Sequence, residues 1–149
     1  MFRHILSPTD GSTLSSKGVK AAIKLAGALD AKLTVIHVVN NFRSDLQDEG
    51  FAMPNIPALR KRFEDAASAR AKKLLDPVKV AAKKAGVECD VVVATGNLPY
   101  EVIINQAGKL RCDVIVMASH GYRGLKGILI GSETVKVLTH SKLPVLVVR

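Results

Sequence analysis

Strand-like apolar runs and amphipathic helix patterns alternate along this chain, and no other feature restricts its possible folds as much. Short runs rich in Val, Ile and Leu are each followed by a stretch with apolar residues three or four positions apart. Strict alternation of this kind requires parallel strands joined by crossover helices. An apolar fraction of 48 % with only 4 % aromatic residues suits a sheet buried beneath helices. The sequence therefore predicts an α/β fold, a single-domain doubly wound parallel sheet with helices on both faces.

Turn and cap residues set the expected boundaries. The predicted strands cover residues 2–7, 32–39, 87–94, 113–118 and 144–149. The predicted helices run from the turn at 10–12 to about 29, from about 58 to 85, from an opening at 97–99 to about 109, and from 132 to about 140. Pro77 predicts a kink or local break in the long helix near 74–76, because proline lacks a backbone N–H. Residues 40–57 show no periodicity and predict a long loop, of the kind that often serves as a lid or binding loop.

A glycine-rich segment follows the fourth predicted strand. Residues 117–135 read MASHGYRGLKGILIGSETV, so four glycines separate a buried strand from a helix that opens at Gly131 and Ser132. Glycine lets the main chain approach phosphate oxygens, and the first N–H groups of a helix point at them. The segment contains neither G-x-x-x-x-G-K-[ST] nor G-x-G-x-x-G. It therefore predicts a phosphate-bearing ligand held by a less common loop.

The turn after the first strand supplies further residues for the predicted binding site of a phosphate-bearing ligand. Ligands of open α/β sheets bind beyond the carboxyl ends of the strands, so adjacent first and fourth strands would bring Asp10 to the glycine loop. Asp10 is then placed to accept a hydrogen bond from a ribose hydroxyl or an adenine amine. The amides of Gly121, Gly131 and Ser132 are placed to bind phosphates, and Arg123 adds positive charge.

Each of these residues also has a purely structural alternative. Asp10 can cap the first helix, and Ser132 is a good N-cap whatever binds there. Glu133 suits the helix dipole but counts against a nearby polyphosphate, because like charges repel. His120 can contact a ligand or simply fill the turn, and no partnered nucleophile accompanies it. The scattered histidines show no metal-ligand spacing, so we predict neither a catalytic residue nor a metal site.

The formal net charge of +9 raises the question of nucleic-acid binding. Nine Lys and Arg lie between Arg60 and Lys84, against three acidic residues, in an Ala-rich stretch whose one aromatic residue is Phe63. We interpret this stretch as the solvated face of a long helix. Nucleic acid is therefore not an expected partner.

The compartment follows from what the sequence lacks. No apolar run approaches the roughly 18 residues of a membrane span, and the amino end shows no secretory pattern. A membrane is therefore not an expected partner, and the cytoplasm is the expected location. Cys89 and Cys112 form no C-x-x-C pair, and we interpret them as reduced, buried side chains.

Four segments together resemble the universal stress protein family. They are P-T-D-G-S at 8–12, H-V-V at 37–39, S-H-G-x9-G-S at 119–132 and the closing THSKLPVLVVR at 139–149. The resemblance covers residues 1–149 as one domain and implies a five-stranded parallel sheet of order 3-2-1-4-5. It also implies a homodimer whose terminal strands pair across a twofold axis, which would cover an edge strand otherwise prone to aggregation. The expected interface residues are Val145, Leu146, Val147 and Val148.

The family's ATP-binding members carry G-x2-G-x9-G-[ST], and this chain has Ala118 at the first glycine. Alanine adds a methyl group and restricts φ, so it either crowds the ligand or is harmless at negative φ. The resemblance implies an ATP site with Asp10 and the Val38 backbone on the adenine side, and Mg²⁺ accompanying the triphosphate. The residues expected at this site are Pro8, Thr9, Asp10, Val38, Met117, Ala118, His120, Gly121, Arg123, Gly131, Ser132, Glu133 and Thr134.

These features lead to one main hypothesis and two alternatives. The main hypothesis is an ATP-binding, homodimeric stress-response switch or sensor with an unidentified protein partner. Little or no hydrolysis is expected, because the sequence shows no general base and no Walker lysine. The first alternative is a nucleotide-free dimeric scaffold for protein interactions, which Ala118 and Glu133 support. The second and less favoured alternative is nucleic-acid binding through the basic long helix.

Overall fold

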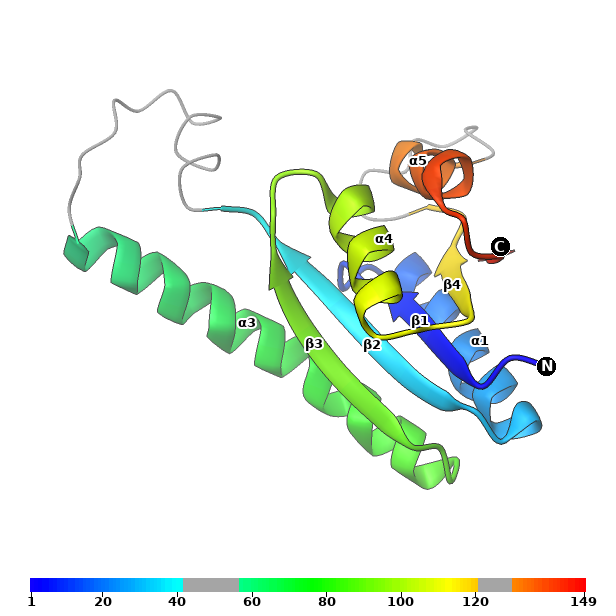
Figure 1. Cartoon of the computed structure of the whole chain (residues 1–149). Helices are drawn as coiled ribbons and strands as arrows, with labels where there is room; N and C mark the ends of the chain where they lie inside the picture. The colour runs from blue at the N-terminus through cyan, green and yellow to red at the C-terminus, as the bar shows by residue number, and fades with distance from the viewer. Residues whose placement is uncertain (42–56, 121–129) are drawn as a thin grey trace.

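The computed structural model describes residues 1–41, 57–120 and 130–149, and it shows the predicted alternation of strands and helices (Figure 1). Five parallel strands lie side by side in the order β3-β2-β1-β4-β5, as the family resemblance implied. The elements are β1 (His4–Pro8), α1 (Thr13–Leu29), β2 (Lys32–Val39), α3 (Pro57–Lys84), β3 (Cys89–Thr95), α4 (Pro99–Lys109), β4 (Val114–Ala118), α5 (Ser132–His140) and β5 (Val145–Val148).

Two apolar clusters, one on each face of the sheet, hold the helices in place. Successive strand residues point to opposite faces. In β1, Ile5 therefore joins a cluster with residues of α1 and α3, whereas Leu6 joins a cluster with residues of α4 and α5. In the central strand β1, Ile5, Leu6 and Ser7 are fully inaccessible, and every residue of the neighbouring β4 is buried. The fold is thus a three-layer sandwich, with α1 and α3 on one side of the sheet and α4 and α5 on the other.

α3 runs through Pro77 without a break, so the local break predicted near 74–76 as one of two possibilities is absent. Pro77 is exposed, and water can therefore satisfy the Lys73 carbonyl that loses its helical donor. Leu75 and Ala82 are buried before and after the proline and hold both halves of the helix against the sheet. Although α3 has 28 residues, no helix in the described part of the chain is both long and apolar enough to span a membrane.

The third strand begins two residues later than predicted, because Val87 takes part in the end of α3. Gly86 adopts a φ of 70°, a conformation that favours glycine. The Val87 N–H then donates to the Ala82 carbonyl at 3.0 Å, which closes the last turn of the helix. The chain enters the sheet only at Cys89.

Asp113 ties the beginning of β1 to the beginning of β4. Its Oδ2 accepts hydrogen bonds from the backbone N–H groups of Arg3 at 2.6 Å and His4 at 2.8 Å. These two donors, Arg3 first, lower the pKa of the Asp113 carboxyl group. The two strands are therefore joined by charge-assisted bonds in addition to the sheet ladder.

Replacing Asp113 with alanine is expected to lower the free energy of unfolding by about 1–2 kcal/mol at pH 7, since two backbone donors lose their acceptor. A lowered pKa means that the stabilisation is complete above the ordinary carboxyl pKa and is lost as pH falls through the folded-state value. D113A should therefore lose less stability than the wild type between about pH 4 and pH 2. Thermal unfolding at several pH values measures this, with D76A as a control at an exposed carboxylate. Equal acid sensitivity of D113A and wild type would contradict it.

Candidate functional site

The carboxyl ends of β1 and β4 lie next to each other, because the two strands pair directly through Ile5 with Val114 and Leu6 with Ile115. Thr9 anchors the turn that follows β1, and its side chain is buried, with 7 % of the residue exposed. Its N–H donates to the Ile36 carbonyl at 2.9 Å, and its hydroxyl hydrogen-bonds to that of Ser15 at 3.0 Å. The turn is thereby held by β2 on one side and α1 on the other.

Asp10 lies exposed at this edge, and Ser12 rather than Asp10 caps α1. The Ser12 hydroxyl accepts from the Ser15 N–H at 3.0 Å, which is the N-cap bond. Asp10 Oδ1 accepts from the Ser12 N–H at 3.0 Å and so stabilises the turn that precedes the helix. Gly11, with a φ of 83°, completes the turn in a conformation that favours glycine. Asp10 therefore presents a carboxylate beyond the sheet in a defined position.

His37 connects the end of β2 to the same turn. Its Nδ1 lies 2.9 Å from the Thr9 carbonyl, and because a carbonyl only accepts, Nδ1 carries the proton. This contact gives His37 a structural role at the turn. A hollow of about 240 Å³ lies beside it, lined by His37, Val38, Val39, Asn40, Phe63, Ala67 and Arg70. The sequence pattern did not indicate the three α3 residues, because only the tertiary fold brings α3 to the end of β2.

The amino end of α5 faces the same edge of the sheet. Gly131, with φ −70° and ψ 153°, is the N-cap and makes no side-chain cap bond, so the prediction of Ser132 as N-cap is wrong. Ser132 is instead the first helical residue and is exposed. The first helical bond runs from the Val135 N–H to the Gly131 carbonyl at 3.0 Å. The preceding N–H groups therefore point out of the helix end, where an anion is favoured.

Close backbone contacts join Gly131 to the end of β4. The Gly131 N–H donates to the Ser119 carbonyl at 2.7 Å. A Cβ at position 131 would lie 3.3 Å from that oxygen and 3.4 Å from the His120 Cα, so a side chain here would require its neighbours to shift by a few tenths of an ångström. His120 Nδ1 hydrogen-bonds with the Ser119 hydroxyl at 3.1 Å, while its buried Nε2 has no partner among the described residues. The ring is thus turned toward the protein.

Glu133 points toward α4. Its Oε2 accepts from the Tyr100 N–H at 3.0 Å, in the first turn of α4, and its Oε1 accepts from Lys136 Nζ at 2.7 Å. The carboxylate raises the pKa of Lys136 through this bond. α4 has no side-chain cap from its own N-cap residue, Leu98, so Glu133 supplies an acceptor from another helix. Its negative charge is therefore engaged by Lys136 and α4, which weakens the objection to a phosphate nearby.

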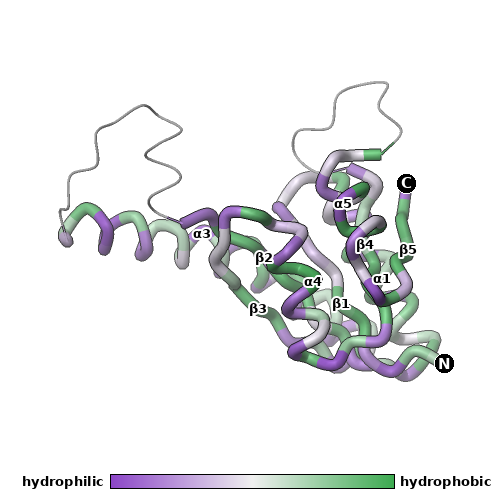
Figure 2. Tube along the Cα trace, turned by 45° about the horizontal axis from the view of Figure 1, so that its top comes forward, coloured by the Kyte–Doolittle hydropathy of each residue, from purple (hydrophilic) through white to green (hydrophobic). Residues whose placement is uncertain are grey.

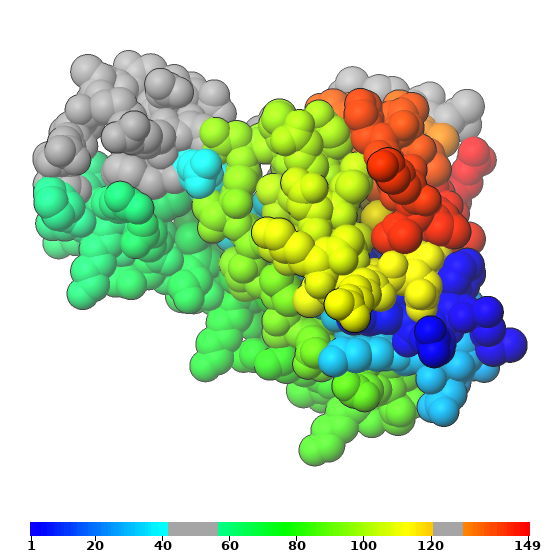
Figure 3. Space-filling view, viewed as in Figure 1, coloured from blue at the N-terminus to red at the C-terminus, as the bar shows by residue number. Residues whose placement is uncertain are grey.

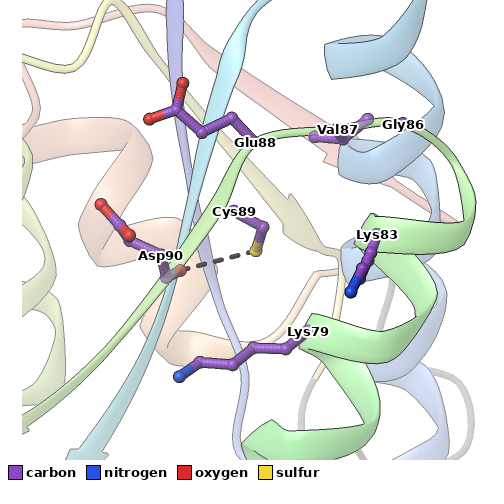
Figure 4. Close-up of a pocket in the computed structure, with 7 residues that line it drawn as sticks. All are labelled: Lys79, Lys83, Gly86, Val87, Glu88, Cys89 and Asp90. Atoms are coloured by element: carbon purple, nitrogen blue, oxygen red, sulfur yellow. Dashed lines mark hydrogen bonds between the residues drawn. The ribbon is translucent and has the colours of Figure 1, made fainter.

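A second hollow, of about 470 Å³, lies at the opposite end of the sheet, where β3 begins (Figure 4). Cys89 lies on its wall, and its thiol donates to the Asp90 carbonyl at 3.5 Å. Burial, the largest cause, raises the pKa of this thiol, which disfavours the nucleophilic thiolate. Among the described residues there is no group of three His, Cys, Asp or Glu side chains that could hold a metal ion. The hollow therefore offers no chemistry comparable to the site at the carboxyl ends.

Comparisons with known proteins agree with the sequence resemblance. The model of the universal stress protein family matches residues 1–149. The chain is 32 % identical to the universal stress protein YxiE of Bacillus subtilis, with 100 % of both chains covered. It is 33 % identical to the universal stress protein MJ0531 of Methanocaldococcus jannaschii, with 100 % of this chain and 83 % of that protein covered. The chain belongs to the universal stress protein family.

Solved structures of universal stress proteins share this fold. The structure of MJ0577 from Methanocaldococcus jannaschii matches with a TM-score of 0.83 at 27 % identity, covering 99 % of this chain and 96 % of that one. A universal stress protein in complex with cAMP matches with a TM-score of 0.70 at 23 % identity, covering 99 % and 97 %. An Arabidopsis thaliana family member with AMP bound matches with a TM-score of 0.66 at 17 % identity, covering 98 % and 90 %. Nucleotides are thus bound by other proteins of this fold.

The universal stress protein motif departs from its ATP-binding form at Ala118. Ala118 is the last residue of β4 and is 7 % exposed, and positive φ values among the described non-glycine residues occur only at Asp30 and Arg111. Its carbonyl accepts from the Thr134 hydroxyl at 3.1 Å, which links β4 to α5. Strand alternation places its methyl group on the same face as Val116, toward α1. Alanine is therefore compatible with the backbone at this position.

The carboxyl edge of the sheet gathers most of the residues expected at a universal stress protein nucleotide site. Gly121 and Arg123 lie outside the described residues. Met117 is 6 % exposed and packs into the apolar cluster beneath α4 and α5, so its side chain belongs to the core. The described residues at or next to this edge are Pro8, Thr9, Asp10, Val38, Met117, Ala118, His120, Gly131, Ser132, Glu133 and Thr134.

Proposed function

We propose that this universal stress protein binds ATP at the carboxyl edge of β1 and β4. The observation that carries the proposal is the convergence of two features from separate parts of the chain on adjacent strands. One is the exposed Asp10 carboxylate, and the other is the uncapped amino end of α5 behind Gly131. A carboxylate suits ribose hydroxyls or an adenine amine, and free helical N–H groups suit phosphates. The cAMP and AMP complexes of proteins with the same fold support a nucleotide as the ligand class.

The described residues fit the triphosphate better than they fit a protein-bound metal ion. Ser132 adds an exposed hydroxyl to the helical N–H groups, and Gly131 leaves the main chain open to close approach. Of the nearby carboxylates, Glu133 is bonded to Tyr100 and Lys136. Mg²⁺ accompanying ATP would therefore be held mainly by phosphate oxygens and water, as is usual for this ion.

We further propose that the protein acts in the cytoplasm as a homodimeric switch or sensor with little or no hydrolysis. A general base is missing near the amino end of α5 among the described residues, because Glu133 is engaged and the His120 ring is turned inward. β5 lies at the edge of the sheet and leaves Leu146 46 % exposed. Pairing of two β5 strands, through Val145 to Val148, would cover this edge.

Titration of nucleotide-stripped protein with ATP and Mg²⁺ is expected to give a dissociation constant in the micromolar range. D10A should weaken binding at least about tenfold, since a polar contact to the ligand is worth roughly 1.4 kcal/mol or more. D10N removes the charge but keeps an oxygen that can accept from the Ser12 N–H. Comparing D10N with D10A therefore separates the effect of the charge from the effect of the turn. D76A, at an exposed carboxylate on α3, is the matched control and should bind as the wild type does.

Two results would contradict this proposal. Absence of ATP binding up to millimolar concentration would favour the nucleotide-free scaffold, whose function lies in protein contacts. Hydrolysis at about 1 s⁻¹ or faster would show that the chain is an ordinary enzyme, since that rate lies within the usual range of turnover numbers.

A further inference from the structure

The two helical layers of the sandwich differ sharply in charge. α1 and α3 pack on one face of the sheet, and α4 and α5 pack on the other (Figure 1). α1 and α3 together carry twelve Lys and Arg against three acidic residues, a surplus of nine that equals the formal net charge of the whole chain, +9. α4 and α5 carry two lysines against two glutamates. The fold therefore concentrates the positive charge of the protein on one layer.

Within α3 the basic residues are regularly spaced. Three adjacent pairs recur every eleven residues, which is close to three full helical turns, so the pairs share one face of the helix. Their separation is about 16 Å, and the row is about 35 Å long at 1.5 Å per residue. In Figure 2, hydrophilic segments recur along this helix. The pairs are Lys61 with Arg62, Lys72 with Lys73, and Lys83 with Lys84.

These six side chains are exposed and are not neutralised by the protein. None of them forms an ion pair with another described residue, whereas the neighbouring Arg60 is bound to Glu64 at 2.8 Å. Asp65 and Asp76 lie between the pairs and reduce the local charge without removing it. The first half of α3 stands out from the body of the protein (Figure 3), and residues 57–62 are all exposed. The row is therefore accessible to a large partner.

α1 extends the same basic surface. It contacts α3 and has no acidic residue. Lys17, Lys20 and Lys24 are exposed and lie three and four positions apart, so they share one side of α1. We call the exposed Lys and Arg of α1 and of the three α3 pairs the basic face.

The spacing suits a phosphodiester duplex. One turn of B-DNA is about 34 Å long, and each of its two strands crosses a given side of the duplex once per turn. The row of α3 pairs, about 35 Å long, spans one such turn and can therefore meet phosphates of both strands. A membrane is a poorer match, because an interfacial helix inserts a broad apolar face, whereas the exposed large apolar residues of α1 and α3 are isolated. They are Leu14, Leu59 and Val80.

We propose that the basic face binds double-stranded nucleic acid through its phosphate backbone, without base-specific contacts. The sequence-based interpretation of residues 60–84 as a solvated face considered the helix alone, and the shared layer with α1 changes that assessment. The first half of α3 reaches the carboxyl edge, where Phe63, Ala67 and Arg70 line the hollow beside Val38. The later pairs, Lys72 with Lys73 and Lys83 with Lys84, do not line that hollow, so substitutions at these pairs test duplex binding separately from ATP binding.

Fluorescence anisotropy with a labelled 30-bp DNA duplex of arbitrary sequence tests the proposal on the full-length protein. We expect binding at about 10 µM near 100 mM salt, within the range of non-specific contacts, and a steep fall with increasing salt. K72Q/K73Q/K83Q/K84Q should weaken binding at least about tenfold and make the logarithmic salt slope shallower by about four. The control K109Q/R111Q/K142Q/R149Q removes four exposed charges outside the basic face and should change affinity less than about threefold. Circular dichroism verifies that both variants are folded.

Three results would overturn the proposal. The first is absence of salt-dependent binding at 50 mM salt. The second is equal weakening in the two quadruple variants, which would show that only net charge matters. The third is binding of phosphatidylserine vesicles at least as tight as duplex binding and weakened by the same α3 substitutions, which would identify a membrane surface as the partner.

Discussion

Alanine at position 18 is expected to lower the free energy of unfolding by about 2 kcal/mol, and the melting temperature by about 4–8 °C. Gly18 lies in α1 where the helix crosses the end of β4. A Cβ at this position would lie 2.7 Å from the Ala118 backbone nitrogen and 3.2 Å from the Met117 carbonyl carbon. Both atoms belong to a buried strand paired with β1 and β5, so they cannot move aside without disturbing the sheet. Overpacking against backbone outweighs the gain in helix propensity.

Gly27, in the same helix, provides the matched control. A Cβ there would lie 3.5 Å from a Val87 methyl group, an ordinary contact. G27A is therefore expected to stabilise the protein by about 0.5–1 kcal/mol through helix propensity. Adding A118G to G18A should not restore stability, because the clash involves the Ala118 nitrogen. Chemical denaturation of the four proteins measures these effects, and a G18A protein as stable as G27A would contradict the expected packing of α1 on β4.

Valine at position 131 is expected to weaken ATP binding at least about tenfold, which corresponds to roughly 1.4 kcal/mol or more. This prediction rests on the proposed function. A Cβ at Gly131 already lies within 3.3 Å of the Ser119 carbonyl, and two further methyl groups require the loop and the end of β4 to separate. The 2.7 Å bond from the Gly131 N–H to that carbonyl would be lost or lengthened. The amino end of α5 would then move away from the position in which its N–H groups can bind phosphates.

A loss of stability accompanies this change, so the measurement must separate folding from binding. G108V is the control, because a Cβ at Gly108 in α4 would have no atom within 4 Å. Circular dichroism first verifies that both variants are folded at 25 °C. Calorimetric titration at the same temperature then gives their affinities for ATP. Wild-type affinity in folded G131V would show that the phosphates do not bind at α5, while leaving the contribution of Asp10 to be decided by D10A.

Most of the fold was predictable from the sequence, because burial imposes its period on the residues. The second strand was predicted with the bounds 32–39 that the structure shows, and the last two helices were predicted to end near Lys109 and His140, as they do. The predictions were wrong where a tertiary contact overrides a local sequence preference. Pro77 interrupts an isolated helix, but packing of Leu75 and Ala82 holds α3 together across it. Val87 has the composition of a strand residue but closes the end of α3.

The candidate site was predictable as a set of loops but not in its contacts. Glycines, Asp10 and the order of the strands indicated which segments meet at the carboxyl edge. Glu133 was expected to oppose a phosphate, because its position in the first turn of a helix was the only information available. In the structure it accepts from Tyr100, 33 positions away along the chain, and from Lys136. A sequence does not specify such a long-range acceptor.

The alternation of strands and helices, the parallel sheet and the family could all be inferred from the sequence, because they depend on periodicity and on short motifs. Three features required the folded structure: which helices share a face, how closely α1 approaches β4 at Gly18, and where the charge gathers. Net charge is a sum over residues, whereas its distribution depends on which segments pack together. α1 and α3 are separated by β2 in the chain but lie on one face of the sheet, and this placement alone turns a charge of +9 into a basic face.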